Sequence, residues 1–118
     1  MTPQTFRLTE LDLDSGAREI RVAGELDLAV ADRLSDAIER SDGADVLISL
    51  EDCEFIDSTG LAVILRAHQA AQRNGGGRVV IHSPSRQVLR VLEVTGLTGD
   101  GFVFASREAA TAGSDAAD

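Results

Sequence analysis

The sequence predicts an α/β domain: a mixed β-sheet that opens with a β-hairpin and has helices packed on it. The length of 118 residues suits one domain, and 43% apolar residues are enough to build a core. Short apolar runs at 46–50 and 78–82 are typical of buried strands, and each is followed by a segment with helical periodicity. Alternating apolar residues on both sides of a turn at 14–16 predict the antiparallel hairpin, which makes the sheet mixed.

The first half of the chain begins with this hairpin and continues into a helix. The two strands are marked by apolar residues that alternate with polar ones, namely Phe6, Leu8, Leu11, Leu13, Ile20 and Val22. The alternation breaks over residues 24–27, and the spacing of a helix face then appears in Val30, Leu34, Ala37 and Ile38. We therefore expect a helix that Asp27 caps at its start and that the turn at 41–43 ends.

Two further helices alternate with the buried strands in the second half of the chain. The first of them covers 61–73 and ends at the glycines 75–77, because glycine accepts the positive φ of a helix end. For the second, Ser83 is the expected N-cap and Pro84 the expected first-turn residue, while Gly96 marks the end. This alternation of strands and helices is the pattern of an α/β sheet.

The end of the chain contains one more short strand, expected at 102–104. The residues that follow are small and polar; they could begin as a helix, but the composition is typical of a terminus that frays. We therefore expect one domain over residues 1–108 and a flexible C-terminal tail over residues 109–118.

The charge composition argues against several classes of function. The formal net charge is -9, and all 11 basic residues are arginines. A chain this acidic is unsuited to binding nucleic acid, and the absence of lysine excludes Schiff-base chemistry. The acidic excess lies within residues 1–54, which carry 14 acidic residues and five arginines. Two interpretations stay open: a mixed solvated surface, or an acidic face that meets a basic partner.

The cysteine content and the start of the chain favour a cytoplasmic protein. Cys53 is the only cysteine, so it has no partner for an internal disulfide, and two histidines do not complete a structural zinc site around it. Residues 1–4 lack the basic and apolar segments of a signal peptide, and the longest apolar run, 61–65, is too short to span a membrane. We expect a cytoplasmic protein with no cofactor, no metal and no membrane partner.

Residues 57–60, Asp-Ser-Thr-Gly, are the most informative segment of the chain. They open a helix after a buried strand, and α/β proteins place function at such strand-to-helix turns. Asp57 and Ser58 can both cap free backbone N–H groups of the helix. The helix N-terminus also carries a partial positive charge, so it would tolerate a phosphate on Ser58. From the residues alone, an ordinary helix cap and a phosphoserine site both stay open.

A hydrolase with Ser58 as nucleophile is a weaker interpretation of the same segment. The nucleophile turn Gly-x-Ser-x-Gly needs a glycine two residues before the serine, where this chain has Ile56. The two candidate bases, His68 and His82, lie on the apolar face of a helix and at the end of a strand, as packing histidines do. The acidic neighbours of Cys53 would raise its pKa and reduce its reactivity. We therefore predict a protein that is not an enzyme.

Three segments resemble the signatures of the STAS family, the sulfate-transporter and anti-sigma-factor-antagonist domains. They are Gly-Glu-Leu-Asp at 24–27, Phe-Ile-Asp-Ser-Thr-Gly-Leu at 55–61, and Leu-Glu-Val-Thr-Gly-Leu at 92–97. Their order and spacing are similar to those of the single-domain bacterial form over residues 6–108. The resemblance implies an α/β fold with a STAS-like mixed β-sheet that opens with a β-hairpin and has helices packed mainly on one face.

The resemblance also implies a role as an anti-sigma factor antagonist. In the family, the serine after the aspartate of Asp-Ser-Ser/Thr-Gly is phosphorylated by a serine/threonine kinase that is also an anti-sigma factor, and the matching residue is Ser58. The unmodified antagonist binds this kinase and releases the sigma factor. Phosphorylation ends the binding, and a metal-dependent serine phosphatase restores it. Family members occur as monomers or weak dimers, and the implied partner-binding residues are Asp27, Asp57, Thr59, Gly60 and Leu61.

A second function stays open within the same family. The chain would then be a STAS scaffold that does not switch, or an accessory subunit of a signalling complex or of a lipid transporter. Such members keep the fold without using the serine. Modification of the protein by a kinase would favour the switch, and stable association with a transporter ATPase would favour the subunit.

Overall fold

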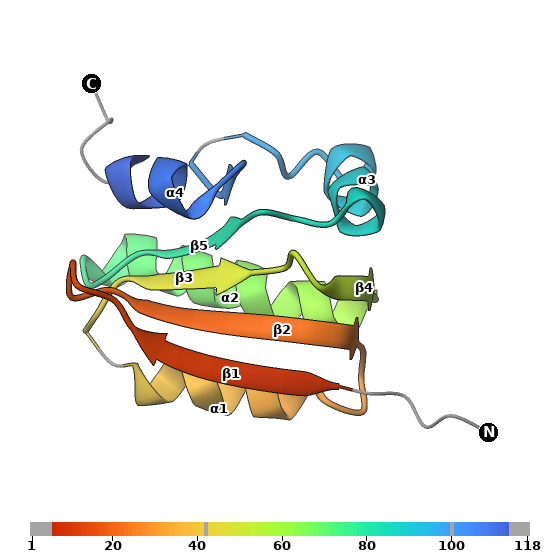
Figure 1. Cartoon of the computed structure of the whole chain (residues 1–118), viewed down its shortest axis with the longest axis horizontal. Coiled ribbons are helices and arrows are strands. Elements are labelled where there is room, and N and C mark those ends of the chain that lie inside the picture. Colours follow the sequence, from red (N-terminus) through yellow and green to blue (C-terminus); the bar gives the residue numbers. More distant parts are fainter. Residues whose placement is uncertain (1–5, 42, 100, 114–118) are drawn as a thin grey trace.

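The computed structural model describes residues 6–41, 43–99 and 101–113. Strands and helices alternate after an opening hairpin, as expected for the α/β class, except that two short strands at 46–49 and 53–56 follow each other directly (Figure 1). No helix in this described part has both the length and the apolar character that a membrane span needs. In chain order the elements are β1 (Arg7–Asp12), β2 (Arg18–Leu26), α1 (Ala31–Arg40), β3 (Val46–Ser49), β4 (Cys53–Ile56), α2 (Ser58–Asn74), β5 (Val79–His82), α3 (Arg86–Val94), β6 (Val103–Phe104) and α4 (Arg107–Gly113).

The sheet is mixed, as the sequence predicts. Its strand order is β1-β2-β3-β5-β6, and only the β1–β2 pair is antiparallel among the described pairs. Strand β2 pairs with β3 along its first half and with β4 along its second half. The register shifts between Gly24 and Glu25, where Gly24 has a φ of 94° that costs glycine little. The break in alternation at 24–27 is therefore a bulge within β2, which continues to Leu26.

Successive residues of the central strands face two separate apolar clusters. Val46 and Ile48 of β3 belong to the main cluster, to which α1, α2 and α3 all contribute buried side chains. Leu47, between them, belongs to a second cluster on the opposite side, together with Ala17, Val80 and Ala110. Three of the four helices thus share one cluster, which agrees with helices lying mainly on one face.

Helix α4 covers the second cluster and changes the expected end of the domain. Ala110 is fully buried, and its carbonyl accepts a hydrogen bond of 2.9 Å from Arg78 Nη2. Over residues 109–113 this helix replaces the flexible tail that the sequence analysis expects after residue 108. The physical reason is that small side chains, which look like a fraying terminus, also let a helix lie close to a sheet. Residues 114–118 of the expected tail lie outside the described residues.

The start of α3 differs from the prediction by two residues. Ser85, not Ser83, is the N-cap, and its Oγ accepts a hydrogen bond of 3.3 Å from the Val88 N–H. The same hydroxyl donates to the Cys53 carbonyl at 2.6 Å, which ties α3 to β4. We call residues 83–88 the Ser85 corner. The Ser85 hydroxyl both accepts and donates a hydrogen bond, so Ser85 has a structural role.

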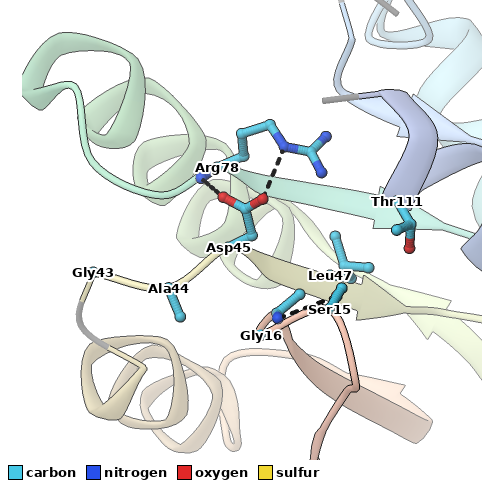
Figure 2. A pocket seen from close by; sticks show the side chains of 9 residues that line it. Ser15, Gly16, Gly43, Ala44, Asp45, Leu47, Arg78 and Thr111 are labelled. Atoms are coloured by element: carbon cyan, nitrogen blue, oxygen red, sulfur yellow. Dashed lines mark hydrogen bonds and ion pairs between the residues drawn. The ribbon is translucent and has the colours of Figure 1, made fainter. Parts of the chain in front are cut away.

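Asp45 and Arg78 form an ion pair at the end of the sheet where β3 and β5 begin (Figure 2). Asp45 accepts hydrogen bonds from the Arg78 backbone N–H at 2.9 Å and from its Nε at 3.4 Å, beside a cavity of about 290 Å³. Gly77 lies so close to Ala44 that a Cβ there would be 2.1 Å from the Ala44 carbonyl oxygen. This end is therefore held by close backbone packing and a satisfied ion pair.

Candidate functional site

The segment that carries Ser58 is positioned by β4, a short strand that the sequence pattern does not predict. Strand β4 pairs in parallel with the last residues of β2, and the Asp57 N–H donates to the Leu26 carbonyl at 3.2 Å. The apolar pattern of this strand is interrupted by Glu54 and preceded by Asp52, which conceals it in the sequence. We call residues 57–61 the Ser58 corner. Because of β4, this corner lies beside the end of β2 and the loop that follows it.

Asp57 holds the corner together with both oxygens of its carboxylate. Oδ1 accepts a hydrogen bond of 2.9 Å from the Gly60 N–H and thereby caps α2. Oδ2 accepts a hydrogen bond of 3.1 Å from the Leu28 N–H, in the loop between β2 and α1. One side chain therefore fixes the start of the helix and the neighbouring loop in relation to each other.

Ser58 is the first residue of α2, and it is exposed. Within the part of the chain that the structure describes, its hydroxyl has no hydrogen-bond partner, because Asp57 already acts as the cap. The backbone N–H groups of Ser58 and Thr59 likewise have no partner among the described residues. The geometry therefore combines a free, accessible hydroxyl with unsatisfied donors at a helix N-terminus.

The other residues of the Ser58 corner, Thr59, Gly60 and Leu61, are half-buried or buried. Thr59 is half-buried, and Gly60 is buried so close to β2 that a Cβ there would lie 2.5 Å from the Leu26 carbonyl oxygen. Leu61 is only 8% exposed and packs in the main cluster. Gly60 and Leu61, which the resemblance implies as partner-binding residues, are both buried in this structure and set the shape of the surface around Ser58.

Asp27 and Leu28 lie in the loop that Asp57 holds. Asp27 is not the cap of α1: its Oδ1 accepts a hydrogen bond of 3.1 Å from the Ala29 N–H, and the cap position is Val30. Leu28 is 72% exposed, although it is a large apolar residue. No sequence motif marks Leu28, and the available signal is an apolar residue outside the spacing of the following helix face.

The other candidate reactive groups have structural roles. His68 Nδ1 donates to the Val79 carbonyl at 2.8 Å, and neither histidine forms a hydrogen bond with Ser58 among the described contacts. Cys53 is buried, and this burial, with a smaller effect of the Glu54 charge, raises the pKa of its thiol. Within residues 6–41, 43–99 and 101–113, no three His, Cys, Asp or Glu side chains gather into a group that could hold a metal ion.

A buried carboxylate on the opposite face fastens α4 to the sheet. Glu19 is fully buried, and it accepts hydrogen bonds of 2.7 Å from Arg107 Nε and Nη2 and 2.7 Å from Arg21 Nε. His82 Nε2 lies 2.9 Å from the same carboxylate. Burial alone would raise the pKa of Glu19, but the bonds from Arg107, Arg21 and His82 outweigh it and lower the pKa to about 2. Glu19 is therefore ionised and structural at neutral pH.

The sequence model of the family described as "Mlab, STAS domain" matches residues 9–104. The chain belongs to the STAS domain family. The anti-sigma F factor antagonist of Paenibacillus polymyxa is 30% identical over 92 residues, which are 75% of this STAS chain and 78% of the relative. An anti-sigma factor antagonist from Mycobacterium paratuberculosis has a similar structure, with a TM-score of 0.74 and 26% identity over 93% of this chain and 94% of that chain.

The unphosphorylated form of the anti-sigma factor antagonist SpoIIAA is also similar, with a TM-score of 0.69 and 25% identity over 92% of this chain and 94% of that chain. The two similar structures cover 92% and 93% of this STAS chain. They confirm the family that the three sequence segments indicate, and they confirm the mixed sheet that begins with a hairpin.

Proposed function

We propose that this STAS protein is an anti-sigma factor antagonist and that Ser58 is its phosphoacceptor. The unmodified form binds an anti-sigma factor serine/threonine kinase and releases the sigma factor. Phosphorylation of Ser58 ends the binding, and a metal-dependent serine phosphatase reverses it. The observation that carries the proposal is the exposed hydroxyl of Ser58, which no described residue engages, at the start of α2. The names of the relatives support the same function.

The start of α2 suits a phosphate on Ser58. A phosphoserine carries about -1.5 to -2 charges and three acceptor oxygens. The unsatisfied N–H groups of Ser58 and Thr59, with the partial positive charge of the helix N-terminus, offer favourable interactions to this group. The modified domain is therefore expected to keep its fold, so that the effect of the phosphate falls on the partner.

The loop beside Ser58 offers an apolar contact for that partner. Leu28 is 72% exposed, and its N–H is held by Asp57, so the loop has a fixed position next to the phosphoacceptor. An exposed apolar side chain in a fixed place is what an interface core uses as an anchor, and charged residues such as Asp27 suit its rim. A kinase that docks on Leu28 would have Ser58 within its footprint.

Like-charge repulsion then explains the switch. The phosphate is added beside the Asp57 carboxylate, on a chain whose net charge is already -9. An acidic group of the partner about 4 Å away would be repelled by about 1 kcal/mol per unit charge in water, and by more in a desolvated interface. Since about 1.4 kcal/mol is tenfold in affinity, one phosphate at the centre of an interface is enough to end binding.

The experiment is a capture of partners from native lysate, read by mass spectrometry, with wild-type, Ser58→Ala and Ser58→Asp proteins as baits. We expect the wild-type and Ser58→Ala baits to retain a serine kinase and the Ser58→Asp bait to lose it by at least about tenfold. Ser15→Asp is the matched control, because it adds the same charge in the β1–β2 turn, at the other end of β2.

Two outcomes would contradict the proposal. If Ser58→Ala takes up phosphate as the wild type does, another residue such as Thr59 is the acceptor. If all three baits retain a transporter ATPase equally, the chain is a non-switching accessory subunit, the second function that the sequence leaves open.

A further inference from the structure

A chain of hydrogen bonds runs from the buried Glu19 carboxylate to the hydroxyl of Ser83. His82 Nε2 lies 2.9 Å from Glu19 Oε1, and His82 Nδ1 lies 2.9 Å from Ser83 Oγ. Glu19 is fully buried and His82 is 4% exposed, whereas Ser83 is half-buried. The three side chains therefore connect the inside of the domain with the turn that follows β5, and the function proposed above uses none of them.

The ionisation of Glu19 sets the direction of these bonds. Glu19 is ionised at neutral pH, because Arg107 and Arg21 donate to its carboxylate, and an ionised carboxylate only accepts. The hydrogen between Glu19 and His82 is therefore on Nε2. In the neutral ring, Nδ1 then has a lone pair, and the Ser83 hydroxyl donates to it. Ser83 Oγ has no other partner among the described residues.

A serine bonded in this way has its own base. In an activated serine, an imidazole takes the hydroxyl proton as the oxygen attacks, and a carboxylate fixes the tautomer of the ring and stabilises its protonated form. Ser83, His82 and Glu19 have this order of donors and acceptors. Ser58 differs, because its hydroxyl is exposed but has no base among the described residues.

The backbone of Ser83 is in a conformation that is unusual for a serine. Its φ is 52°, and within residues 6–41, 43–99 and 101–113 it is the only residue other than glycine with a positive φ. The next residue, Pro84, restricts the backbone of Ser83 further. The Ser83 N–H donates to the Phe104 carbonyl at 3.0 Å, which holds the turn against β6. Residues held in such conformations are frequent at sites where the orientation of a side chain matters.

Acyl transfer is the reaction that gains most from this base. When an alcohol oxygen adds to a carbonyl carbon, the hydroxyl must lose its proton as the bond forms. Phosphoryl transfer has a looser transition state and depends more on positioning and on neutralisation of charge. The start of α3 also has free donors for a developing oxyanion, since the N–H groups of Arg86 and Gln87 have no partner among the described residues.

We propose that Ser83 is an acylation site that takes the acyl group of a neutral, activated carboxylic ester, with His82 as the general base and Glu19 as a positioning residue. A bond forms between Ser83 Oγ and the carbonyl carbon, and the bond from that carbon to the leaving oxygen breaks. The proton of the Ser83 hydroxyl passes through His82 Nδ1 to the leaving group. The product is an ester on Ser83, at a different strand-to-helix turn from Ser58.

The small neutral ester p-nitrophenyl acetate is the probe. Release of nitrophenolate is followed by its absorbance, and the acetylated residues are identified by mass spectrometry of peptides. Because the chain contains no lysine, no side-chain amine competes for the acetyl group. We expect Ser83 to be acetylated at least about tenfold faster than Ser58, although Ser58 is the more exposed of the two.

Variants separate the roles of the hydroxyl and the base. Ser83→Gly removes the hydroxyl and suits a positive φ, so the variant should stay folded and lose the acetylation at this position. His82→Gln can still donate to Glu19 but has no base, so acetylation of Ser83 should slow at least about tenfold. Ser35→Ala is the matched control, because Ser35 is a half-buried serine of α1 without a described hydrogen-bond partner, and its loss should leave the rate unchanged.

Two further measurements test the His82 ring itself. The charged groups around it are Glu19 and Arg21 of β2 and Arg107 of α4. A protonated ring cannot accept a proton, so the acetylation rate should rise with pH and level off when the ring is neutral. Because Glu19 acts through the ring, its role is tested by ¹⁵N NMR: the neutral ring should carry its hydrogen on Nε2 in the wild type, and Glu19→Gln should populate both tautomers.

Three results would overturn the proposal. They are acetylation of Ser58 or Ser35 as fast as that of Ser83, an unchanged rate in His82→Gln, and a hydrogen on Nδ1 of the neutral wild-type ring. All three concern Ser83 and its base, so they leave the proposed phosphorylation of Ser58 to its own experiment.

Discussion

The molecule contains two strand-to-helix corners that each carry a serine, and the two hydroxyls are used differently. In the Ser85 corner, the hydroxyl of Ser85 caps the helix and also donates to the Cys53 carbonyl at 2.6 Å. In the Ser58 corner, the carboxylate of Asp57 caps the helix, and the hydroxyl of Ser58 has no partner among the described residues. The difference shows how a protein can keep a serine free at a helix start: the preceding aspartate takes over the capping.

This division of roles gives the Ser58 corner a fixed backbone and a free side chain. Asp57 holds both the Gly60 and the Leu28 N–H groups, so neither α2 nor the adjacent loop depends on Ser58 for its position. A modification of Ser58 therefore changes the surface without removing a structural contact. The same modification at Ser85 would break the cap of α3.

Gly60→Ala should have the largest effect on the Ser58 corner. A Cβ at this position would lie 2.5 Å from the Leu26 carbonyl oxygen, so the helix start and the end of β2 would have to move apart. We expect a loss of about 3 kcal/mol in the free energy of unfolding, measured by urea denaturation. Gly76→Ala is the control, because a Cβ there would meet no atom within 4 Å. Equal stability of the two variants would contradict the close approach.

Arg107→Ala tests the opposite face, where neither corner is involved. The change removes the two hydrogen bonds that Arg107 makes to the buried Glu19 carboxylate, and we expect a loss of about 2 kcal/mol in unfolding free energy. Arg66→Ala, an exposed arginine of α2, is the control and should be within about 0.5 kcal/mol of wild type. A similarly small effect of Arg107→Ala would mean that α4 does not depend on Glu19.

The pH dependence of stability sharpens the same test. The pKa of Glu19 is lowered from 4.5 to about 2 by its partners, so its stabilising contribution is present above the ordinary carboxyl pKa. That contribution is lost as the pH falls from about 4.5 towards 2, because protonation of Glu19 then favours the unfolded chain. Urea midpoints measured across this range should fall more steeply for wild type than for Arg107→Ala. Parallel curves would contradict the assignment.

The smallest effects compare the two serines directly. Ser85→Ala removes a helix cap and should cost about 1 kcal/mol in unfolding free energy. Ser58→Ala removes a hydroxyl that has no described partner and should change stability by less than about 0.5 kcal/mol. Thermal unfolding of the two variants side by side measures the difference, and the reverse order would show that Ser58 is the structural serine.

The parts of the fold that the sequence predicted are those with a regular local pattern. The buried strands β3 and β5 and the long helix α2 have such patterns, and they appear close to their expected positions. Strand β4 was missed because Glu54 interrupts its four residues and its pairing with β2 is long-range. A helix that frays was expected where α4 lies, because its anchor, the contact between Arg107 and Glu19, joins residues that are far apart in the chain.

The start of α2 was predictable in its location and not in its contacts. The Asp-Ser-Thr-Gly segment marks a helix start, and the structure has α2 begin at Ser58. Which of the two residues caps, however, depends on side-chain orientation, and the bond from Leu28 to Asp57 depends on β4. Asp27 was expected to cap α1 because it precedes an apolar helix pattern, but its carboxylate closes a tighter turn with Ala29.

The most direct test of the proposed switch is the affinity of a captured anti-sigma factor kinase for the protein before and after stoichiometric phosphorylation, measured by calorimetry. The account predicts tight binding of the unmodified protein, a loss of at least about tenfold after one phosphate enters at Ser58, and full recovery after a phosphatase removes it. An affinity that does not change with the phosphate on Ser58 would contradict the account, as would a phosphate that enters the Ser58→Ala variant.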